Sequence, residues 1–505
     1  MGRAGNSKAT GRWDRQEMTR AIRQCATSGT VRPALIGAAL TLVVALVGIA
    51  RPSVWFDEAA TISAVDRGFG SYVELISAVD AVHGLYYLVM MPWVQVFGIS
   101  ALSIRAPSAL VLAACAFFTV KLTMHYTGKV DRVRAVRAGW AAALLFAVLP
   151  GLTWMGQDAR GYPFGTTCVV LGLWCYERWL STRDDRWLGA FVVAHTVGIY
   201  FVLYAAMLVP LYVVRSFWLH RGAAARTFAA ALAIGAATLP LVFAALPQQG
   251  QVSWIGNTVS DVMRRVATNQ FFMGQHNNEA PWFETLKVMS WALFALTVVI
   301  IVVGRRERGA RSSRIWLLSW ILFPVAILVG LQMAGGQFYD ERYLAFTGPV
   351  LVVLIAMSVT LNRLPQSVGL IALTVMVLAC LPAVAAQHGE AAKFRFNYQA
   401  AATFLGSADT IYFLDPSARG IPLAYPKLVV AREPLLEFTP AESGTLWGVS
   451  RPIDTVFDEK PSGSVAIVDY RSGRYDGVVA HFVSIGCTPL DTYDDTRHRA
   501  ILLRC

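Results

Sequence analysis

Residues 34–50 read ALIGAALTLVVALVGIA, a run of 17 residues without a charged side chain. A helix rises about 1.5 Å per residue, so such a run can nearly cross a hydrocarbon core about 30 Å thick. Similar runs recur along the chain of 505 residues, of which 55% are hydrophobic and 15% charged. Soluble proteins carry about 25% charged residues. The composition therefore predicts a polytopic membrane protein and argues against fibrous, disulfide-scaffold and nucleic-acid-binding classes.

Eleven apolar runs are predicted to span the membrane as helices. They cover residues 34–50, 106–126, 138–155, 162–179, 188–202, 203–218, 227–246, 284–303, 315–334, 344–361 and 367–385. Residues 188–218 could alternatively form one long helix. Residues 85–97 are also apolar but too few to cross, so we expect a helix at the membrane surface. The expected fold is an α-helical polytopic membrane protein with about 11 transmembrane helices.

Positive charge is distributed unevenly between the loops. The net charge is +12, and Lys and Arg gather before the first run and in four loops, at 129–137, 183–186, 221–226 and 305–314. Because basic loops stay on the cytoplasmic side, residues 1–33 are predicted as a basic cytoplasmic tail and 51–105 as a long external loop. No small-residue cleavage site follows residue 50, so we expect the first run to remain attached.

The composition changes after residue 385, the end of the predicted transmembrane domain at 34–385. Short β-rich runs alternate with turn residues, and we expect strands at 410–414, 428–431, 445–449, 465–469, 478–484 and 500–503. Residues 386–505 are therefore predicted as a soluble α/β domain, and an odd number of spans places it outside. Cys487 and Cys505 flank two candidate strands in this domain. They are candidates for a disulfide across a hairpin, or for two unpaired thiols.

The sharpest candidate site is Asp57-Glu58, just past the first apolar run. A carboxylate at a membrane–water boundary gains basicity from desolvation, which suits a general base. Adjacent side chains diverge, so one can face an acceptor hydroxyl while the other holds a partner or a cation. The alternative is a solvated helix N-terminus, where the helix dipole favours acidic residues.

Two more clusters of acid, arginine and tyrosine lie at external ends of apolar runs. The first contains Asp158, Arg160 and Tyr162, and the second contains the sequence Asp340-Glu341-Arg342-Tyr343. Arginine can bind phosphate oxygens in a bidentate manner, which suits an anionic donor substrate. The alternatives are an interfacial ion pair with a belt tyrosine for the first, and a charged helix cap for the second. The spans would bring all three clusters around one external pocket.

Histidines and amides provide weaker signals. His83 lies in the external loop, and His195 and His276 lie in or near other outward segments. One of them could bind a metal with Asp57 or Glu58, but no local spacing indicates it, so a divalent cation stays open. The loop at 247–283 is rich in amides and tryptophan, which suits either sugar recognition or any headgroup-level loop.

Several short motifs, in their order and spacing, resemble the C-type (GT-C) glycosyltransferases. More narrowly, they resemble the group containing the protein O-mannosyltransferases and the lipid A aminoarabinose transferases. The matching motifs are Trp55-Phe56-Asp57-Glu58, His83-Gly84-Leu85-Tyr86-Tyr87, Arg105-Ala106-Pro107-Ser108-Ala109, Gln157-Asp158-Ala159-Arg160-Gly161-Tyr162 and Glu341-Arg342-Tyr343-Leu344. The family often has His-Pro-Pro-Leu-Tyr-Tyr where this chain has His83-Gly84-Leu85, and Glu where Asp158 stands. The similarity covers roughly residues 34–385.

The resemblance implies a glycosyltransferase of the cell inner (cytoplasmic) membrane. Its donor would be a polyprenyl-phosphate sugar of mannose or arabinose type, and its acceptor a hydroxyl of an envelope glycan, lipid or protein on the outer face. Asp57 would be the general base of an inverting reaction, and Arg160 and Arg342 would bind the donor phosphate. Glu58 and Asp158 would position the acceptor, the arginines or a cation. The remaining implied substrate-binding residues are His83, Tyr87, Tyr162, Glu341 and Tyr343.

Two other functional classes stay open at this point. A flippase or transporter of lipid-linked sugars would also need an apolar groove, but it predicts ionisable residues at mid-membrane. The predicted spans hold few of them, among them Lys121 and Glu177, which lie near the ends. A non-catalytic envelope scaffold would instead use the external domain to bind partners.

Overall fold

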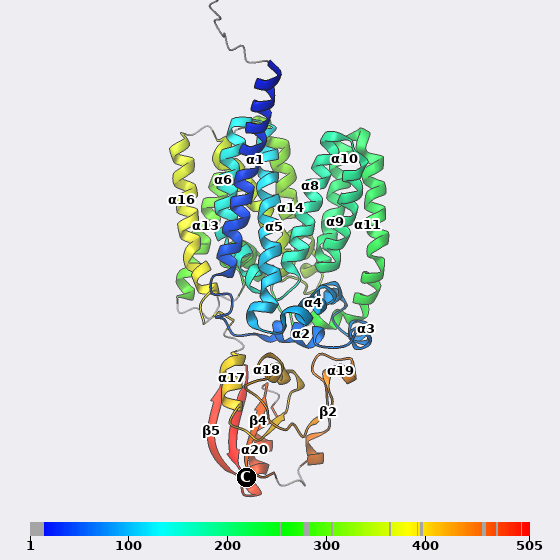
Figure 1. The fold of residues 1–505 in the computed structure, drawn as a ribbon, viewed down its shortest axis with the longest axis vertical. Helices are drawn as coiled ribbons and strands as arrows, with labels where there is room; N and C mark the ends of the chain where they lie inside the picture. Colours follow the sequence, from blue (N-terminus) through cyan, green and yellow to red (C-terminus); the bar gives the residue numbers. More distant parts are fainter. Residues whose placement is uncertain are drawn as a thin grey trace, which may run out of the picture.

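A bundle of apolar helices forms most of the molecule (Figure 1). The computed structural model describes residues 15–252, 254–275, 282–304, 307–362, 365–390, 392–393, 397–456, 461–470, 473–495 and 497–505, without the side chains of 15–30 and 252. The bundle helices are α1 (Arg15–Leu46), α5 (Ala101–Gly128), α6 (Arg132–Val148), α8 (Tyr162–Thr182), α9 (Asp185–Phe201), α10 (Val209–Leu219), α11 (Ala224–Ala245), α13 (Phe283–Gly304), α14 (Arg311–Met333), α15 (Gly348–Leu361) and α16 (Gln366–Gln387). A helix of this bundle lies at each of the eleven predicted positions.

By length and composition, six helices of the described residues can cross a membrane. A seventh crosses if α6 and the bent segment Pro150–Gln157 that follows it form one span. The protein is thus a multi-pass membrane protein, and the count of eleven spans stays a prediction. Residues 188–218 do not form one long helix, because the chain breaks at Val202 between α9 and η3 (Leu203–Leu208).

Short helices cover the end of the bundle that carries the candidate site. They are α2 (Phe56–Val65), α3 (Phe69–Ala78), η1 (Ala81–His83), α4 (Gly84–Phe97), α7 (Pro150–Thr153), η2 (Trp154–Gln157), η5 (Leu246–Val252), α12 (Val259–Ala267), η6 (Asn269–Met273) and η8 (Glu341–Thr347). The helix α4 is the one predicted at the membrane surface, and it lies beside α2 and α3 at this end (Figure 1).

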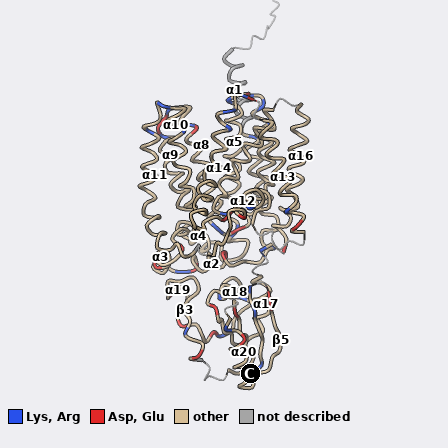
Figure 2. The backbone as a smooth tube through the Cα atoms, turned by 180° about the vertical axis from the view of Figure 1, so that it is seen from behind, with Lys and Arg blue, Asp and Glu red and all other residues tan. Residues whose placement is uncertain are grey.

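The opposite end of the bundle carries η4 (Arg221–Ala223), η7 (Arg308–Ala310) and the basic loops. Figure 2 shows Lys and Arg gathered there, where α5 and α10 end, while the middle of the bundle has few charges. Side chains of the predicted tail up to residue 30 lie outside the described part of the chain.

The C-terminal region forms a four-stranded sheet with helices on both faces. Its elements are α17 (Tyr398–Leu405), β1 (Thr410–Phe413), η10 (Pro416–Arg419), α18 (Gly420–Ala424), β2 (Leu436–Phe438), α19 (Pro440–Ser443), β3 (Val449–Ser450), η11 (Ile453–Val456), β4 (Ser464–Asp469), α20 (Tyr475–Ser484), β5 (Thr488–Asp494) and β6 (Arg499–Arg504). The strand order is β1-β4-β6-β5, with β1 parallel to β4 and the other two pairs antiparallel; β2 and β3 pair separately.

Alternating side chains of the central strand β4 are buried on both faces of this sheet. Val465 and Ile467 belong to a cluster with Phe482 of α20. Ala466 and Val468 belong to the large cluster that includes α17 and continues into the helical bundle. Because successive strand residues point to opposite faces, β4 contributes to both cores.

Three of the six predicted strands have matching strands, β1, β4 and β6. The strand predicted at residues 478–484 is wrong. These residues lie in helix α20, where Val478 and Phe482 are four residues apart and face the sheet together. Residues 428–431 do not form a strand, and of 445–449 only Val449 lies in one, β3.

Candidate functional site

The three acidic clusters predicted from the sequence meet at one end of the bundle, beside the C-terminal region. Asp57 lies at the start of α2, Arg160 between η2 and α8, and Arg342 in η8. The Arg342 Nη1 donates to Asp57 Oδ2 at 2.7 Å, and the Arg160 Nη2 lies 3.4 Å from the same oxygen. The Asp57 side chain is 15% exposed. One accessible carboxylate is thus flanked by two guanidinium groups, which favour its ionised form.

Local contacts fix the position of Asp57. Trp55 is extended at the N-cap, so Asp57 and Glu58 occupy the first turn of α2, where the helix dipole favours negative charge. The Thr61 hydroxyl donates to the Ala159 carbonyl at 3.0 Å and joins α2 to the segment that carries Arg160.

Glu58 lies behind Asp57 and is completely buried. Arg105 of α5 donates to both of its carboxylate oxygens, at 2.7 and 2.6 Å, and the Ala159 amide donates at 3.1 Å. Burial alone would raise the pKa of Glu58, but the charges of Arg105 and Lys393 bring it down to about 2. The sequence alternative of a solvated helix terminus does not describe Glu58, because its side chain has no exposure.

The Lys393 side chain enters this cluster from the segment that connects α16 to the C-terminal region. Its ammonium donates to Glu58 at 2.8 Å and to the Gln157 carbonyl at 2.7 Å, and it lies 3.3 Å from Asp158. Lys393 has a φ of +68°, in the left-handed region that few residues other than glycine adopt. Sequence reasoning missed it, because no motif or apolar pattern surrounds this lysine.

Asp158 does not pair with Arg160, its neighbour in the sequence. Instead, the Trp55 indole donates to Asp158 Oδ1 at 2.8 Å. Burial raises the pKa of Asp158, although Lys393 opposes the shift. Asp158 therefore belongs with Glu58 and Lys393 in the buried layer, while Arg160 points to the cavity.

The predicted residues His83 and Tyr87 lie beside Arg160. The Arg160 Nη1 donates to the Tyr87 hydroxyl at 3.0 Å, and this hydroxyl donates to Asp80 at 2.8 Å. Burial, reinforced by Arg160, lowers the pKa of His83 to about 4, so its ring is neutral near pH 7. The hydrogen bonds from Arg160 to Tyr87 and from Tyr87 to Asp80 hold the Arg160 guanidinium in place on this side of the cavity.

Arg342 is fixed in a similar way from the opposite side. Its Nε donates to Asp340 Oδ1 at 3.0 Å, and Arg265 of α12 contacts both Asp340, at 3.1 Å, and Glu341. Arg265 was not predicted, because its amphipathic helix has no catalytic motif. The Tyr343 ring packs on Tyr204 with centroids 4.8 Å apart.

These groups line a cavity of about 1440 Å³. Its charged and histidine lining includes Asp57, His83, Arg160, Arg342 and Lys393. Its apolar and aromatic wall is built by Phe201, Leu203, Tyr204, Val242, Ala245, Leu246 and Phe338. A further wall of the cavity belongs to the C-terminal region and contains Leu446, Tyr470 and Arg497.

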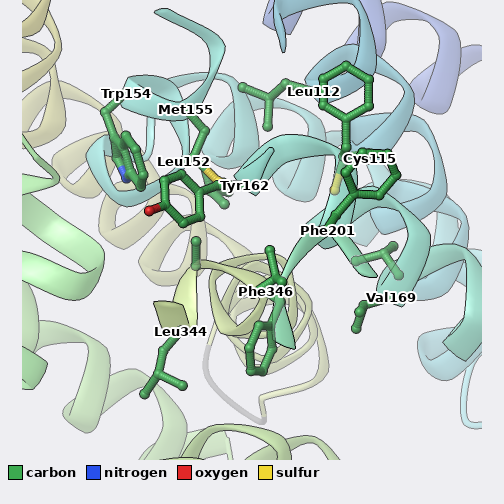
Figure 3. Packing of buried hydrophobic residues seen from close by; sticks show 14 of the residues in the cluster. Leu112, Cys115, Leu152, Trp154, Met155, Tyr162, Val169, Phe201, Leu344 and Phe346 are labelled. Carbon is green, nitrogen blue, oxygen red and sulfur yellow. The ribbon is translucent and has the colours of Figure 1, made fainter. Parts of the chain in front are cut away.

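Below the cavity the core is densely packed. Tyr162 lies on Trp154 with ring centroids 5.6 Å apart, and Figure 3 shows these rings with Met155, Leu152 and Phe346 around them. Tyr162 also lines the cavity. A rigid floor of this kind keeps the charged groups above it in place.

Part of the amide-rich loop at 247–283 reaches the cavity. Gln248, Trp254 and Asn257 line it, and the Trp254 ring lies 5.4 Å from the Arg342 guanidinium. His276 lies outside the described residues, and so do its neighbours up to residue 281.

Within the part of the chain that the structure describes, no group of three or more His, Cys, Asp and Glu side chains is placed to hold a metal ion. His195 is not brought to the site, because it is buried in α9 between Phe191 and Tyr212. Cys487 and Cys505 form a disulfide that joins the start of β5 to the residue after β6, with Cα atoms 4.2 Å apart.

The fold resembles that of two crystal structures of ArnT from Cupriavidus metallidurans. The apo structure has a TM-score of 0.58 and 11% sequence identity, and the similarity covers 92% of this chain and 97% of that chain. The structure bound to undecaprenyl phosphate has a TM-score of 0.56 and 12% identity, with the same coverage. No protein-family model and no curated protein matches the sequence. The C-type glycosyltransferase fold implied by the sequence motifs is thus confirmed.

Proposed function

We propose that this protein is a membrane glycosyltransferase that moves a sugar from a polyprenyl-phosphate donor to an acceptor hydroxyl. The observation that carries the proposal is the position of Asp57 between Arg160 and Arg342, in a cavity with one apolar wall. The fold supports it, because ArnT shares this fold and one ArnT structure contains undecaprenyl phosphate.

The two arginines provide the donor phosphate site. Their guanidinium groups converge on one oxygen of Asp57, so the space beside that oxygen lies within reach of both. Guanidinium groups match phosphate oxygens in charge and geometry. The prenyl chain then extends along the apolar wall, which Val242 and Leu246 at the end of α11 line together with Phe338.

Asp57 acts as the general base. It takes the proton of the acceptor hydroxyl, whose oxygen attacks the anomeric carbon from the side opposite the phosphate. The bond from this carbon to the phosphate oxygen breaks as the glycosidic bond forms, so the configuration inverts. Polyprenyl phosphate leaves with the electron pair, and Arg160 and Arg342 stabilise the charge that develops on it.

Donor binding also prepares the base. Both arginines are directed at Asp57 in the structure. A phosphate between them competes for their hydrogen bonds and weakens their hold on the carboxylate, which then accepts a proton more readily. Glu58 and Asp158 are buried with their cationic partners, so in this proposal they position Asp57 and Arg160 and do not touch substrate.

The cellular setting follows from the distribution of charge. The site lies at the end of the bundle opposite the basic loops, which are retained in the cytoplasm by the positive-inside rule. In this proposal the transfer takes place on the outer face of the inner membrane, by a protein with eleven spans and an external C-terminal domain. The donor sugar of mannose or arabinose type and the envelope hydroxyl as acceptor rest on the resemblance of the sequence motifs.

Sugar transfer by the purified protein tests the proposal. The full chain in detergent is given radiolabelled polyprenyl-phosphate mannose or arabinose together with cell-envelope extract as the acceptor. Release of polyprenyl phosphate by the wild type, and its loss in Asp57→Asn, is the expected result. Asp454→Asn, an exposed carboxylate outside the cavity, is the matched control and retains activity.

A parallel pair of variants tests the phosphate site. Arg160→Ala weakens binding of the donor, whereas Arg226→Ala, on the surface at the other end of the bundle, does not. If the wild type binds these donors but neither transfers nor hydrolyses the sugar, the proposal is wrong, and a flippase or a scaffold takes its place.

A further inference from the structure

We infer that the C-terminal region forms the acceptor half of the site, with Tyr470 and Arg497 as a subsite for a carbohydrate acceptor. The inference rests on the proposed function and adds the chemical class of the second substrate. It starts from the wall of the cavity that no helix of the bundle supplies, which contains Leu446, Tyr470 and Arg497.

The position of this wall separates the two substrates. A prenyl chain reaches the cavity from the membrane, along the ends of α11 and η3. The C-terminal region lies beyond the end of the bundle, on the side away from the predicted membrane (Figure 1). An acceptor that approaches from water therefore meets the C-terminal wall before it reaches Asp57.

Hydrogen bonds hold this wall in a fixed position relative to α2 and α3. The Ser63 hydroxyl donates to the Leu446 carbonyl, and the Ser71 hydroxyl donates to the Ala441 carbonyl at 2.6 Å. The Arg67 Nη2 donates to the Thr445 carbonyl at 3.0 Å. These contacts attach the C-terminal region to α2, which carries the proposed general base, and to α3, which follows it.

An aromatic contact joins the two parts next to the base itself. The Trp447 ring lies 5.1 Å from the ring of Phe56, the residue before Asp57. Burial raises the pKa of Tyr398, and Tyr470 and Asp57 raise it further. The C-terminal wall and the general base thus face one continuous space.

The chemistry of Tyr470 and Arg497 suits a sugar. The Arg497 guanidinium lies over the Tyr470 ring, 5.8 Å from its centre, and both side chains line the cavity, so an aromatic ring and a cation stand together in its wall. Binding sites commonly combine an aromatic surface with a few placed polar groups. In this inference a pyranose or furanose ring packs its C–H face against the pair of phenol and guanidinium, and its hydroxyls accept hydrogen bonds from the guanidinium.

Competing acceptors of different classes test the inference. The wild type and its variants receive the donor that supports transfer, with one of three acceptors. The three acceptors are short oligosaccharides of mannose, short oligosaccharides of arabinose, and a peptide rich in serine and threonine. Transfer to an oligosaccharide is expected. Transfer to the peptide alone would overturn the assignment of a carbohydrate acceptor.

Two substitutions locate the subsite. Tyr470→Ala and Arg497→Gln are each expected to raise the KM for the oligosaccharide about tenfold, while the KM for the donor changes less than twofold. Tyr470→Phe keeps the ring and is expected to restore most of the affinity. Phe438→Ala and Arg451→Ala, exposed positions of the same region outside the cavity, are the matched controls.

Failure of the inference is distinguishable from failure of the proposed function. If Tyr470→Ala and Arg497→Gln are folded, as judged by size-exclusion elution and thermal unfolding, and their acceptor KM equals that of the wild type, the subsite lies elsewhere. If either does not fold, calorimetry with Tyr470→Leu and Arg497→Lys decides in its place: weaker binding of the oligosaccharide than by the wild type supports the subsite, and equal binding overturns it. If the wild type transfers no sugar and releases no more polyprenyl phosphate than Asp57→Asn, the proposed function itself is wrong, whatever the subsite variants show.

Discussion

The Lys393 ammonium lies 2.8 Å from Glu58 Oε1, although 335 residues separate the two in the chain. Glu58 has a second cation, Arg105, on its other side. Both partners are needed, because an ionised carboxylate without exposure to water is unstable unless it is paired and hydrogen-bonded. The contact makes the linker to the C-terminal region part of the scaffold of the site.

Replacement of Lys393 is expected to destabilise the protein and to reduce its activity. Lys393→Met leaves Glu58 and Asp158 with one fewer cation, and loss of one partner of a buried ion pair costs about 3–5 kcal/mol. Thermal unfolding in detergent micelles measures the stability, with exposed Lys427→Met as the control. The double variant Lys393→Met with Glu58→Gln removes one charge of each sign and should recover part of the loss. Equal unfolding temperatures for the two variants would contradict this.

The sharing of the arginines between Asp57 and donor predicts ordered binding. The acceptor should bind productively only after the donor, and polyprenyl phosphate should inhibit competitively against the donor. Arg342→Ala should lower kcat about 10²–10³-fold, as loss of one charge-stabilising donor commonly does. Initial rates with both substrates varied, and product inhibition, provide the measurement. A random-order pattern in the wild type would speak against the shared role.

A low pH should destabilise the protein, because it protonates the Glu58 carboxylate. Its pKa is about 2 in the folded chain and about 4.5 when unfolded, so the folded state binds fewer protons between these values. The stability from this group is full above about pH 4.5 and is lost as the pH falls towards 2. Unfolding by SDS in mixed micelles at pH 3, 4, 5 and 6 measures the change. Glu58→Gln should show a flatter pH dependence, and an identical profile would refute this assignment.

Reduction of the disulfide should destabilise the sheet of the C-terminal region. Cys487 and Cys505 close a loop of 18 residues, for which chain-entropy arguments give about 3 kcal/mol. Cys487→Ser should therefore increase proteolysis within this region while the bundle helices stay intact. Limited digestion with and without reductant, followed by mass spectrometry, is the measurement. Unchanged digestion on reduction would show that the disulfide adds no stability.

The bundle could be predicted because one physical rule governs it. A helix that crosses a membrane must be long and apolar, so each run is visible in the sequence without its neighbours. The C-terminal region lacks such a rule, and 478–484 shows the difficulty. Its β-branched residues favour a strand by local propensity, yet packing of Val478 and Phe482 on the sheet makes it helix α20.

The site was predicted only where charge appears in an apolar context. Asp57, Arg160 and Arg342 stand out at the ends of apolar runs, and the structure brings them together. Arg265 and Lys393 lie in polar segments, where a basic side chain is common and does not indicate a functional site. Their roles depend on tertiary contacts that no local pattern encodes.

The sequence also gave little indication of a buried ion cluster at the far end of the bundle. There, Glu177 contacts Arg215 and Lys129, and accepts a hydrogen bond from Tyr126 at 2.7 Å. In the sequence Glu177 is an ionisable residue near the end of a predicted span, and no local pattern pairs it with Arg215. Glu177 and Arg215 lie at the end of the bundle opposite Asp57, away from the proposed chemistry.

The long separation between Glu58 and Lys393 also sets the order in which the protein matures. Ribosomes add about 5–20 residues per second, so on the order of 20–70 s pass between synthesis of the two residues. During that interval the first helices are inserted while Glu58 has Arg105 as a cationic partner, but the ammonium group that also contacts Asp158 has not yet been made. The proposed active centre of the nascent chain therefore becomes complete only near the end of translation, and a chain released before residue 393 carries Asp57 and Glu58 without the lysine that joins Glu58 to Asp158.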